Sequence, residues 1–251
     1  MALLETQNVT KDFGGLVAIK DVSFKVELGE VVGLIGPNGA GKTTLFNIIT
    51  GLMKPDSGEV LFQGKSIKEL RPHAISKLGI ARTFQSVRPF LNHTVRQNIA
   101  VGAMYGRQRP SNAKARDDQV KIEEILKTLN LKKKENELAK NLPIEERKMV
   151  EVGRALAADP KLLMLDEPMA GLNPYEVSQF VNLIKSFRER GITVLIVEHV
   201  MKAISSACTR VIVLHHGELL AEGAPSAVLS NQQVVDVYLG DSYGANRISG
   251  S

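Results

Sequence analysis

The sequence predicts an α/β protein with a small antiparallel β lobe and an inserted helical lobe. The first 30 residues alternate apolar and polar side chains, as antiparallel strands with one solvated face do. Between residues 92 and 159, apolar side chains recur at helical spacing instead. Residues 30–35 and 162–165 are compact apolar runs, which are typical of strands buried on both faces of a parallel sheet.

The remaining elements follow in chain order from the same patterns. Helices are expected where apolar residues recur at helical spacing: from Thr43 to Ile49, over Val120, Ile122, Ile125, Leu126 and Leu129, over Met149, Val152, Ala155 and Leu156, and from Tyr175 to Arg190. Further strands are expected at 58–64, at 192–197 and as a late pair around 211–218. The polar segment 105–118 is expected to be a mobile connection. We therefore expect a single domain over residues 1–240, a helical subdomain at about 90–160 and a flexible tail at 241–251.

The composition is that of a protein with a substantial core. Of the 251 residues, 43% are hydrophobic, which suits one large domain or a domain with a subdomain. No apolar run approaches the roughly 18 residues needed to span a bilayer, and the first residues lack the features of a secretory signal. The single Cys208 excludes an internal disulfide, suits a reducing cytoplasm and is expected to be a small core residue. The net charge of +5 is too diffuse to indicate a nucleic-acid partner.

Residues 36–44 match G-x-x-x-x-G-K-[ST], the phosphate-binding loop called Walker A. Glycines let the backbone curve so that its N–H groups point at phosphate oxygens. Lys42 is expected to reach the β- and γ-phosphates, and the Thr43 hydroxyl to ligate Mg²⁺. A Gly-rich segment before a helix is usually only a turn, but here an apolar strand precedes it and a helix follows, which is the context that this loop requires. The sequence thus predicts nucleotide binding by Gly36, Pro37, Asn38, Gly39, Ala40, Gly41, Lys42, Thr43 and Thr44.

Two carboxylates follow the apolar run at 162–165. Open α/β sheets place ligand chemistry at the carboxyl ends of strands. Asp166 is therefore expected to hold Mg²⁺, directly or through water, and Glu167 to polarise the attacking water. The alternative is a strand end that turns polar because it meets solvent. His199 is a candidate for contacting the γ-phosphate, although a lone His at a strand end is more often an ordinary surface residue. Gln85 is a candidate for reaching the metal or the water, although a lone Gln carries no signal on its own.

Taken in order, these motifs closely resemble the ATPase subunits of ABC transporters, and the resemblance covers about residues 4–239. It implies a P-loop NTPase core of ABC ATPase type that hydrolyses ATP with Mg²⁺. It also implies that adenine stacks on Phe13. From the residues alone, Phe13 could equally be a core side chain. Besides Walker A, the matching positions are Gln85 in the Q-loop, Asp166 at the end of Walker B, the catalytic Glu167, the D-loop Ala170-Gly171-Leu172-Asn173 and the switch His199.

Three short stretches resemble the branched-chain amino-acid importer subfamily, and within it the subunit type usually paired with a second, different ATPase. The resemblance implies import of branched-chain amino acids or related small solutes, at the cytoplasmic face of the inner (cell) membrane. The implied partners are transmembrane permease subunits, a second ATPase subunit (hetero- or homodimer) and, indirectly, a solute-binding protein, with no nucleic acid. The stretches are Arg82-Thr83-Phe84-Gln85, Val197-Glu198-His199 and Val237-Tyr238-Leu239-Gly240.

Two other functions stay open from the sequence. One is a non-transport ABC ATPase that regulates another assembly, although such proteins usually carry two ATPase halves or long coiled-coil insertions, and neither is present here. The other is a small-molecule kinase that uses the same phosphate loop. Glu167 and His199 favour water over a second substrate as the acceptor, which argues against the kinase.

One loop departs from the family pattern. The signature loop, usually Leu-Ser-Gly-Gly-Gln, reads Leu142-Pro143-Ile144-Glu145-Glu146 here. In the family, its Ser hydroxyl and Gly backbone bind the γ-phosphate of ATP held on the opposite subunit. Pro143 offers neither a hydroxyl nor an N–H, and Glu145 puts a carboxylate there, although Pro at the first helical position and Glu in the first turn also suit an ordinary helix start. We therefore expect an asymmetric dimer with one competent and one weakened ATP site.

Overall fold

The computed structural model describes residues 2–85, 88–106 and 114–238. The expected tail at 241–251 lies outside these residues, as do residues 107–113 of the connection expected at 105–118. Tyr105 ends one helix and residues 114–118 begin another, so that part of the prediction is wrong. The chain divides into two compact units, which are described separately. Unit 1 comprises Met1–Leu70 and Leu195–Ser251, and unit 2 comprises Arg71–Val194.

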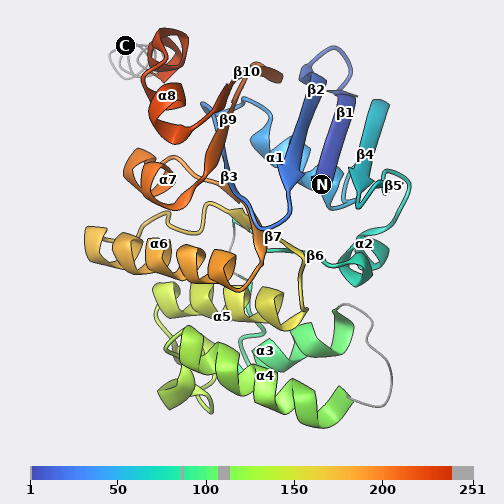
Figure 1. Ribbon diagram of the computed structural model, residues 1–251. Helices are drawn as coiled ribbons and strands as arrows, with labels where there is room; N and C mark the ends of the chain where they lie inside the picture. Colours follow the sequence, from blue (N-terminus) through green and yellow to red (C-terminus); the bar gives the residue numbers. More distant parts are fainter. Residues whose placement is uncertain (1, 86–87, 107–113, 239–251) are drawn as a thin grey trace. The chain divides into compact units, whose positions relative to one another are not determined.

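Unit 1 contains the expected antiparallel sheet, whose strands lie in the order β2-β1-β4-β5 (Figure 1). Leu4 of β1 lies opposite Val26 of β2 and Phe62 of β4, and all three side chains are buried. One face of this sheet therefore forms core while the alternate residues are solvated, as the sequence pattern predicted. The strands are β1 (Ala2–Asp12), β2 (Val17–Glu27), β4 (Ser57–Phe62) and β5 (Lys65–Ser66).

Unit 1 also holds three strands of a second sheet, in the order β10-β9-β3. β3 (Val31–Ile35) pairs in parallel with β9 (Arg210–His215), and β9 pairs antiparallel with β10 (Glu218–Gly223), which confirms the predicted late strand pair. Every residue of β3 is buried, as expected for a parallel strand. The helices of unit 1 are α1 (Lys42–Ile49), α7 (Met201–Ala207) and α8 (Pro225–Leu229).

Cys208 follows α7 and is buried against β3. A Cβ placed on Gly33 of β3 would lie 3.1 Å from the Cys208 Sγ, so the absence of a side chain at Gly33 makes room for the thiol. Burial, with a smaller contribution from the Glu198 carboxylate, raises the pKa of the Cys208 thiol to about 12. The prediction that Cys208 is a core residue is confirmed.

Unit 2 combines parallel strands with a group of helices. β6 (Ile80–Arg82) pairs in parallel with β7 (Leu162–Asp166), whose residues are all buried. β8 (Thr193–Val197) contains the boundary between the two units. The helices are α2 (Pro72–Leu78), α3 (Val95–Tyr105), α4 (Lys114–Thr128), α5 (Ile144–Ala157) and α6 (Pro174–Glu189), with short 3₁₀ turns η2 (Lys132–Lys134) and η3 (Ala139–Asn141).

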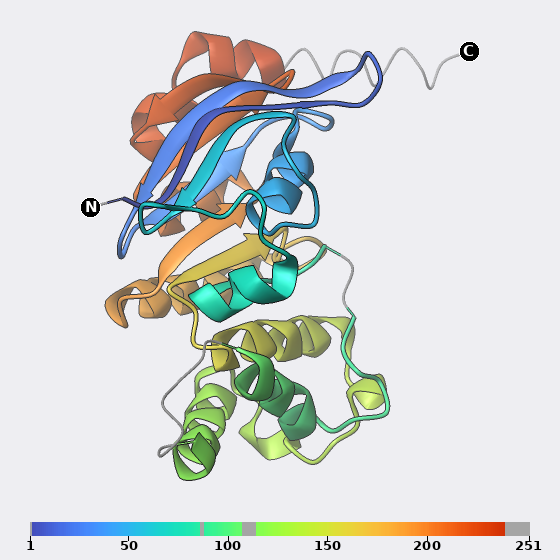
Figure 2. The same cartoon turned by 90° about the vertical axis from the view of Figure 1, so that its right-hand side faces the viewer.

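Helices α3, α4 and α5 pack on one another, and their green to yellow ribbons lie together in Figure 2. α3 and α5 approach so closely that a Cβ on Gly102 would overlap the carbonyl oxygen of Arg154. In α4, Ile122, Ile125 and Leu126 are buried, but Val120, which belongs to the same expected helix, is 55% exposed. Two residues correspond to about 200° around a helix, so Val120 and Ile122 face opposite sides. We propose that residues 90–160 form the helical subdomain.

Helices α6 and α3 each begin with a capping box. Asn173 accepts hydrogen bonds from the backbone N–H of Tyr175 and Glu176 at 3.0 Å, and Glu176 accepts one from the Asn173 N–H in return. Thr94 and Gln97 form the same reciprocal box at the start of α3.

Among the described residues, every helix is too short or too polar to cross a membrane.

Candidate functional site

The predicted phosphate loop lies in unit 1 between β3 and α1. β3 ends at Ile35, and α1 begins at Lys42 after Gly41, so the expected strand, loop and helix follow one another without interruption. Asn38, Gly39 and Thr43 are exposed at this end of α1. The first turn of α1 contains no acidic residue, so nothing there offsets the positive end of the helix dipole. The loop therefore presents backbone N–H groups and a positive field to an anion.

The glycines of the loop are required by their backbone angles and by close packing. Gly36, Gly39 and Gly41 have φ of +149°, +78° and +100°, a region that side chains strain. A Cβ on Gly36 would overlap the carbonyl oxygen of Leu214 in β9, and one on Gly41 would lie 2.5 Å from the Ala18 carbonyl oxygen in β2. Gly36 and Gly41 thus fix the loop against its neighbours, while Gly39 needs only the left-handed turn.

The Lys42 ammonium lies over its own loop. Its Nζ donates to the carbonyl oxygens of Gly36 at 2.6 Å and Pro37 at 2.8 Å. The loop is further held by the Gly217 N–H, which donates to the Ala40 carbonyl at 3.2 Å. The Lys42 ammonium is thereby held against the loop, and an ammonium is a strong donor to phosphate oxygens.

Two further candidates belong to unit 1. Phe13 lies in the turn between β1 and β2, and its side chain is 48% exposed, with the Lys11 Nζ 5.7 Å from the ring centroid. The core alternative for Phe13 is therefore wrong, because about half of the residue is exposed. His199 is exposed, and its backbone N–H donates to the Glu198 carboxylate at 3.1 Å.

Asp166, in unit 2, is the last residue of β7 and forms a buried ion pair. Its Oδ2 accepts from the Arg82 guanidinium at 2.6 Å, and the side chains of Arg82 and Asp166 are 6% and 2% exposed. The Asp166 N–H also donates to the Thr83 hydroxyl at 3.3 Å. Arg82 was not expected from the sequence, where it stands as a lone charge after two apolar residues. It compensates the buried carboxylate and holds it in one orientation.

Glu167 and Gln85 are brought together in unit 2. The Gln85 Nε2 donates to the Glu167 Oε2 at 2.9 Å, so Gln85 contacts the candidate base itself. Glu167 has φ of +48°, which is uncommon for a residue with a Cβ and is typical of functional sites. Asp166, Glu167 and Gln85 line a small cavity of about 10 Å³ together with Lys148 and Glu151.

These residues fit ATP and Mg²⁺. Gly36 and Gly41 leave no room for a Cβ against the carbonyl oxygens of Leu214 and Ala18, so only glycine allows the backbone curve that turns N–H groups toward a phosphate. Thr43 and Asp166 are oxygen donors, which hard cations prefer. Within the described ranges, no three His, Cys, Asp or Glu residues form a metal cluster.

The altered signature loop, in unit 2, forms the start of α5. Leu142 is buried, Pro143 is the residue before the helix, and the helix begins at Ile144. Pro143 was expected at the first helical position, so that prediction was off by one residue. Glu145 and Glu146 occupy the first turn, where carboxylates stabilise the helix dipole.

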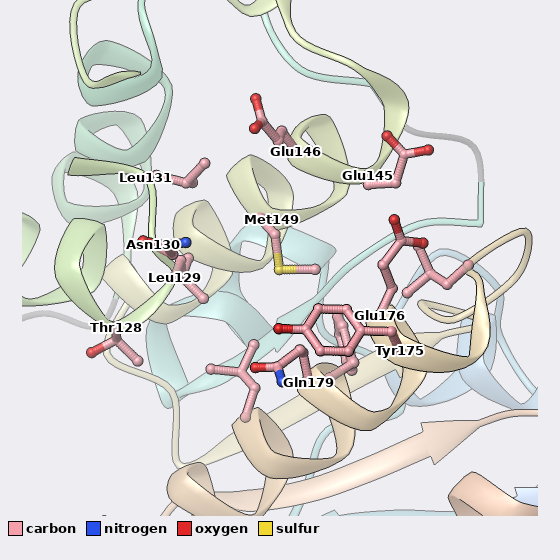
Figure 3. A pocket seen from close by; sticks show the side chains of 13 residues that line it. Thr128, Leu129, Asn130, Leu131, Glu145, Glu146, Met149, Tyr175, Glu176 and Gln179 are labelled. Carbon is pink, nitrogen blue, oxygen red and sulfur yellow. The ribbon is translucent and has the colours of Figure 1, made fainter. Parts of the chain in front are cut away.

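The two first-turn carboxylates have different surroundings. The Lys134 ammonium contacts Glu146 at 2.7 Å. Glu145 has no hydrogen bond or ion pair within the described part of the chain. Figure 3 shows Glu145 and Glu146 on α5 and Glu176 on α6 around one pocket of about 320 Å³. The start of α5 is thus strongly acidic.

Two residues of α5 were missed by sequence reasoning. The Lys148 Nζ donates to the carbonyl oxygens of Pro168 and Ala170, just after Glu167. The Glu151 carboxylate accepts from the Arg88 N–H at 2.6 Å, and burial raises its pKa. Charged side chains in a helix with an apolar stripe usually face solvent. The sequence therefore gave no signal that Glu151 is buried or that Lys148 binds backbone carbonyls.

The family described as ABC transporter matches residues 19–170, and the family described as branched-chain amino acid ATP-binding cassette transporter matches residues 218–244. A probable branched-chain amino acid transport ATP-binding protein LivG of Archaeoglobus fulgidus is 38% identical over 96% of both chains. The high-affinity branched-chain amino acid transport ATP-binding protein BraF of Pseudomonas aeruginosa is also 38% identical, over 96% of this chain and 98% of its own. The lipopolysaccharide export system ATP-binding protein LptB of Haemophilus influenzae is 35% identical over 97% of this chain and 99% of its own.

Solved structures agree with the sequence comparison. An ATP-binding cassette of an ABC transporter in its ADP conformation is similar with a TM-score of 0.87 and 36% identity, covering 96% of this chain and 99% of that one. A nucleotide-free cassette is similar with a TM-score of 0.85 and 35% identity, over 95% and 99%. The predicted fold class and the resemblance drawn from the motifs are both confirmed. This chain belongs to the ABC transporter family and is one of its ATP-binding, ATP-hydrolysing subunits.

Proposed function

We propose that this subunit binds ATP with Mg²⁺ at residues 36–44 and powers the import of branched-chain amino acids or related small solutes. The observation that carries the nucleotide site is the strained glycine turn with the Lys42 ammonium fixed over it. The cargo assignment is supported by the names of the relatives and by the match of residues 218–244.

Each site residue has a proposed role in the reaction. Lys42 binds the phosphates, and Thr43 and Asp166 would hold Mg²⁺, which would neutralise charge on the phosphate oxygens. Glu167 takes a proton from water as the water oxygen bonds to the γ-phosphorus, and the bond from that phosphorus to the ADP oxygen breaks so that ADP leaves. Gln85 orients the Glu167 carboxylate, and His199 contacts the γ-phosphate. Phe13 stacks on the adenine. Most of the rate enhancement then comes from fixed charges and oriented N–H groups around the developing negative charge.

The altered signature loop supports an asymmetric ATPase pair. Two unit charges about 4 Å apart repel by roughly 4 kcal/mol at an effective dielectric constant near 20. Because Lys134 contacts Glu146, Glu145 is the carboxylate with the greater effect on a phosphate presented by the partner ATPase. In a mixed dimer one competent site remains, whereas a homodimer would have both sites weakened.

The partners and location follow from the transporter role. We propose that transmembrane permease subunits and a second ATPase subunit bind this chain at the cytoplasmic face of the cell membrane, with a solute-binding protein acting indirectly. The other candidate is a non-transport ABC ATPase that regulates another assembly. Co-purification of permease subunits with the tagged chain supports the transporter role, and their absence from a detergent extract that retains the second ATPase contradicts it.

Replacing Lys42 by alanine is expected to weaken the binding of labelled ATP roughly 10- to 100-fold, because charge-assisted hydrogen bonds contribute about 1.5–3 kcal/mol. Equilibrium binding of a fluorescent ATP analogue measures the change. Lys54→Ala is the matched control, since Lys54 is an exposed lysine of the same unit paired with Glu69. Undiminished affinity in Lys42→Ala would overturn the assignment of the nucleotide site.

Replacing Glu145 by glycine is expected to raise ATP turnover of the mixed dimer, roughly tenfold for each 1.4 kcal/mol of repulsion removed. Glu145→Gln separates the charge from the backbone effect, and Glu124→Gln on α4 controls for net charge. Phosphate release by the chain alone and with its partner ATPase is the measurement. Brisk, cooperative turnover by the unaltered chain alone would contradict the asymmetric pair.

A further inference from the structure

The segment that follows Glu167 is a compact turn with an unusual backbone. Glu167 lies in the left-handed region at φ +48°, which a residue with a Cβ adopts only when its surroundings hold it there. The Ala170 N–H donates to the Glu167 carbonyl at 3.2 Å, and the Leu172 N–H donates to the Met169 carbonyl at 3.1 Å. The backbone angle of Glu167 sets the direction of its carboxylate, so whatever stabilises this turn also orients the candidate base.

Lys148 of α5 binds this turn from outside it. Its Nζ donates to the Pro168 carbonyl at 3.2 Å and, at a shorter distance, to the Ala170 carbonyl. These carbonyls lie on the two sides of Met169, whose side chain is buried. Hydrogen bonds from an ammonium are stronger than those from a neutral donor, so Lys148 is well suited to hold a strained turn closed.

Two other residues of helix α5, Glu151 and Arg154, bind the backbone of Arg88 and so fix the helix that carries Lys148. Glu151, one turn after Lys148, is 4% exposed and accepts from the Arg88 N–H at 2.6 Å. Arg154 donates to the Glu151 carboxylate at 3.2 Å and to the Arg88 carbonyl at 3.3 Å. Lys148 and Glu151 also line the small cavity that Gln85 and Glu167 share. Lys148 therefore extends from a fixed helix toward the turn and the side chain that it would orient.

We propose that Lys148 is a positioning residue for Glu167, which rests on the proposed role of Glu167 as the base. Lys148 closes the turn at Pro168 and Ala170, and the closed turn keeps the Glu167 carboxylate on the Gln85 amide. Helix α5 begins within the altered loop 142–146 and also carries Lys148. Lys148 therefore connects the orientation of Glu167 to the position of this helix.

The test compares Lys148→Met with Lys148→Arg in the complete transporter complex. Methionine has a side chain of similar length to that of lysine but lacks the ammonium group. We expect kcat for ATP hydrolysis to fall roughly 10- to 100-fold, as for a misplaced catalytic group, while KM for ATP stays within about twofold. Lys148→Arg should restore most of kcat, because a guanidinium also donates to carbonyl oxygens. Lys121→Met is the control, since Lys121 is a comparably buried lysine of unit 2 that pairs with Asp159.

A second arm separates this inference from the proposed role of Glu167. Adding Lys148→Met to Glu167→Gln should lower the residual rate no further, because the lysine acts through Glu167. If Glu167→Gln loses activity while Lys148→Met keeps normal kcat, the positioning role is overturned and the base stands. If Lys148→Met slows Glu167→Gln as strongly as it slows the unaltered chain, the lysine is not acting through Glu167. The same conclusion follows if Lys148→Met lowers kcat no more than Lys121→Met does. If Glu167→Gln itself hydrolyses ATP normally, the role of Glu167 fails first.

Discussion

Glu167→Gln is expected to lower the kcat of ATP hydrolysis by a factor of about 10²–10⁴, the usual contribution of a general base. A carboxamide has nearly the shape of a carboxylate but does not take up the proton of the attacking water. The Gln85 amide still finds an oxygen acceptor at position 167, so the turn and the fold are expected to persist. ATP binding should be retained because Glu167 is not a phosphate ligand in the proposed mechanism. Single-turnover phosphate release and equilibrium binding of labelled ATP measure the two effects separately.

The matched control for this prediction is Glu189→Gln. Glu189 is an exposed glutamate at the end of α6, so the substitution makes the same chemical change in the same unit without touching the site. Its kcat should equal that of the unaltered protein. Hydrolysis by Glu167→Gln at the control rate would show that another group activates the water.

Arg82→Met is expected to lower the free energy of unfolding by about 3–5 kcal/mol, the cost of leaving one partner of a buried ion pair uncompensated. The reason is the Asp166 carboxylate, which is 2% exposed and has its Oδ2 2.6 Å from the Arg82 guanidinium. Methionine fills part of the space but supplies neither the charge nor the donor. Urea unfolding followed by circular dichroism measures the loss through the midpoint and the extrapolated free energy.

Two comparisons show whether the buried charge is responsible. Lys54→Met breaks an ion pair with Glu69 in which both side chains are 66% exposed, and such pairs contribute only about 0–1 kcal/mol. The double replacement Arg82→Met with Asp166→Leu removes both charges and should regain most of the stability, while hydrolysis is lost. A double variant no more stable than Arg82→Met would assign the loss to packing.

The parts of the site that are local in sequence were predictable. The strand, glycine loop and helix at 31–49 follow from apolar patterning and from a motif with a physical reason at each fixed position. The helix expected from Tyr175 to Arg190 was equally predictable from its apolar spacing, and α6 runs from Pro174 to Glu189. In both cases the pattern that predicts the element is local in sequence, although the contacts of β3 with β9 and of Gly36 with Leu214 are not.

The parts that depend on pairing between distant segments were not predictable. Arg82 meets Asp166 because β6 and β7 pair in parallel with Arg82 opposite Met164, a register that no pattern within either strand specifies. Lys148 binds carbonyl groups, which carry no sequence signature at all. Val120 shows the same limit inside one helix, since the apolar spacing alone did not say which side of α4 would be covered.

The chain contains one cysteine, and its surroundings make it chemically quiet. Burial raises the pKa of the Cys208 thiol to about 12, so the thiol stays protonated at pH 7, and the sulfur is buried against Gly33 of β3. Maleimide and disulfide reagents therefore meet no ready nucleophile in the native protein. A single cysteine introduced on the surface can be labelled with a fluorophore or spin probe without first mutating the natural one, which makes this subunit convenient for following domain movements during turnover.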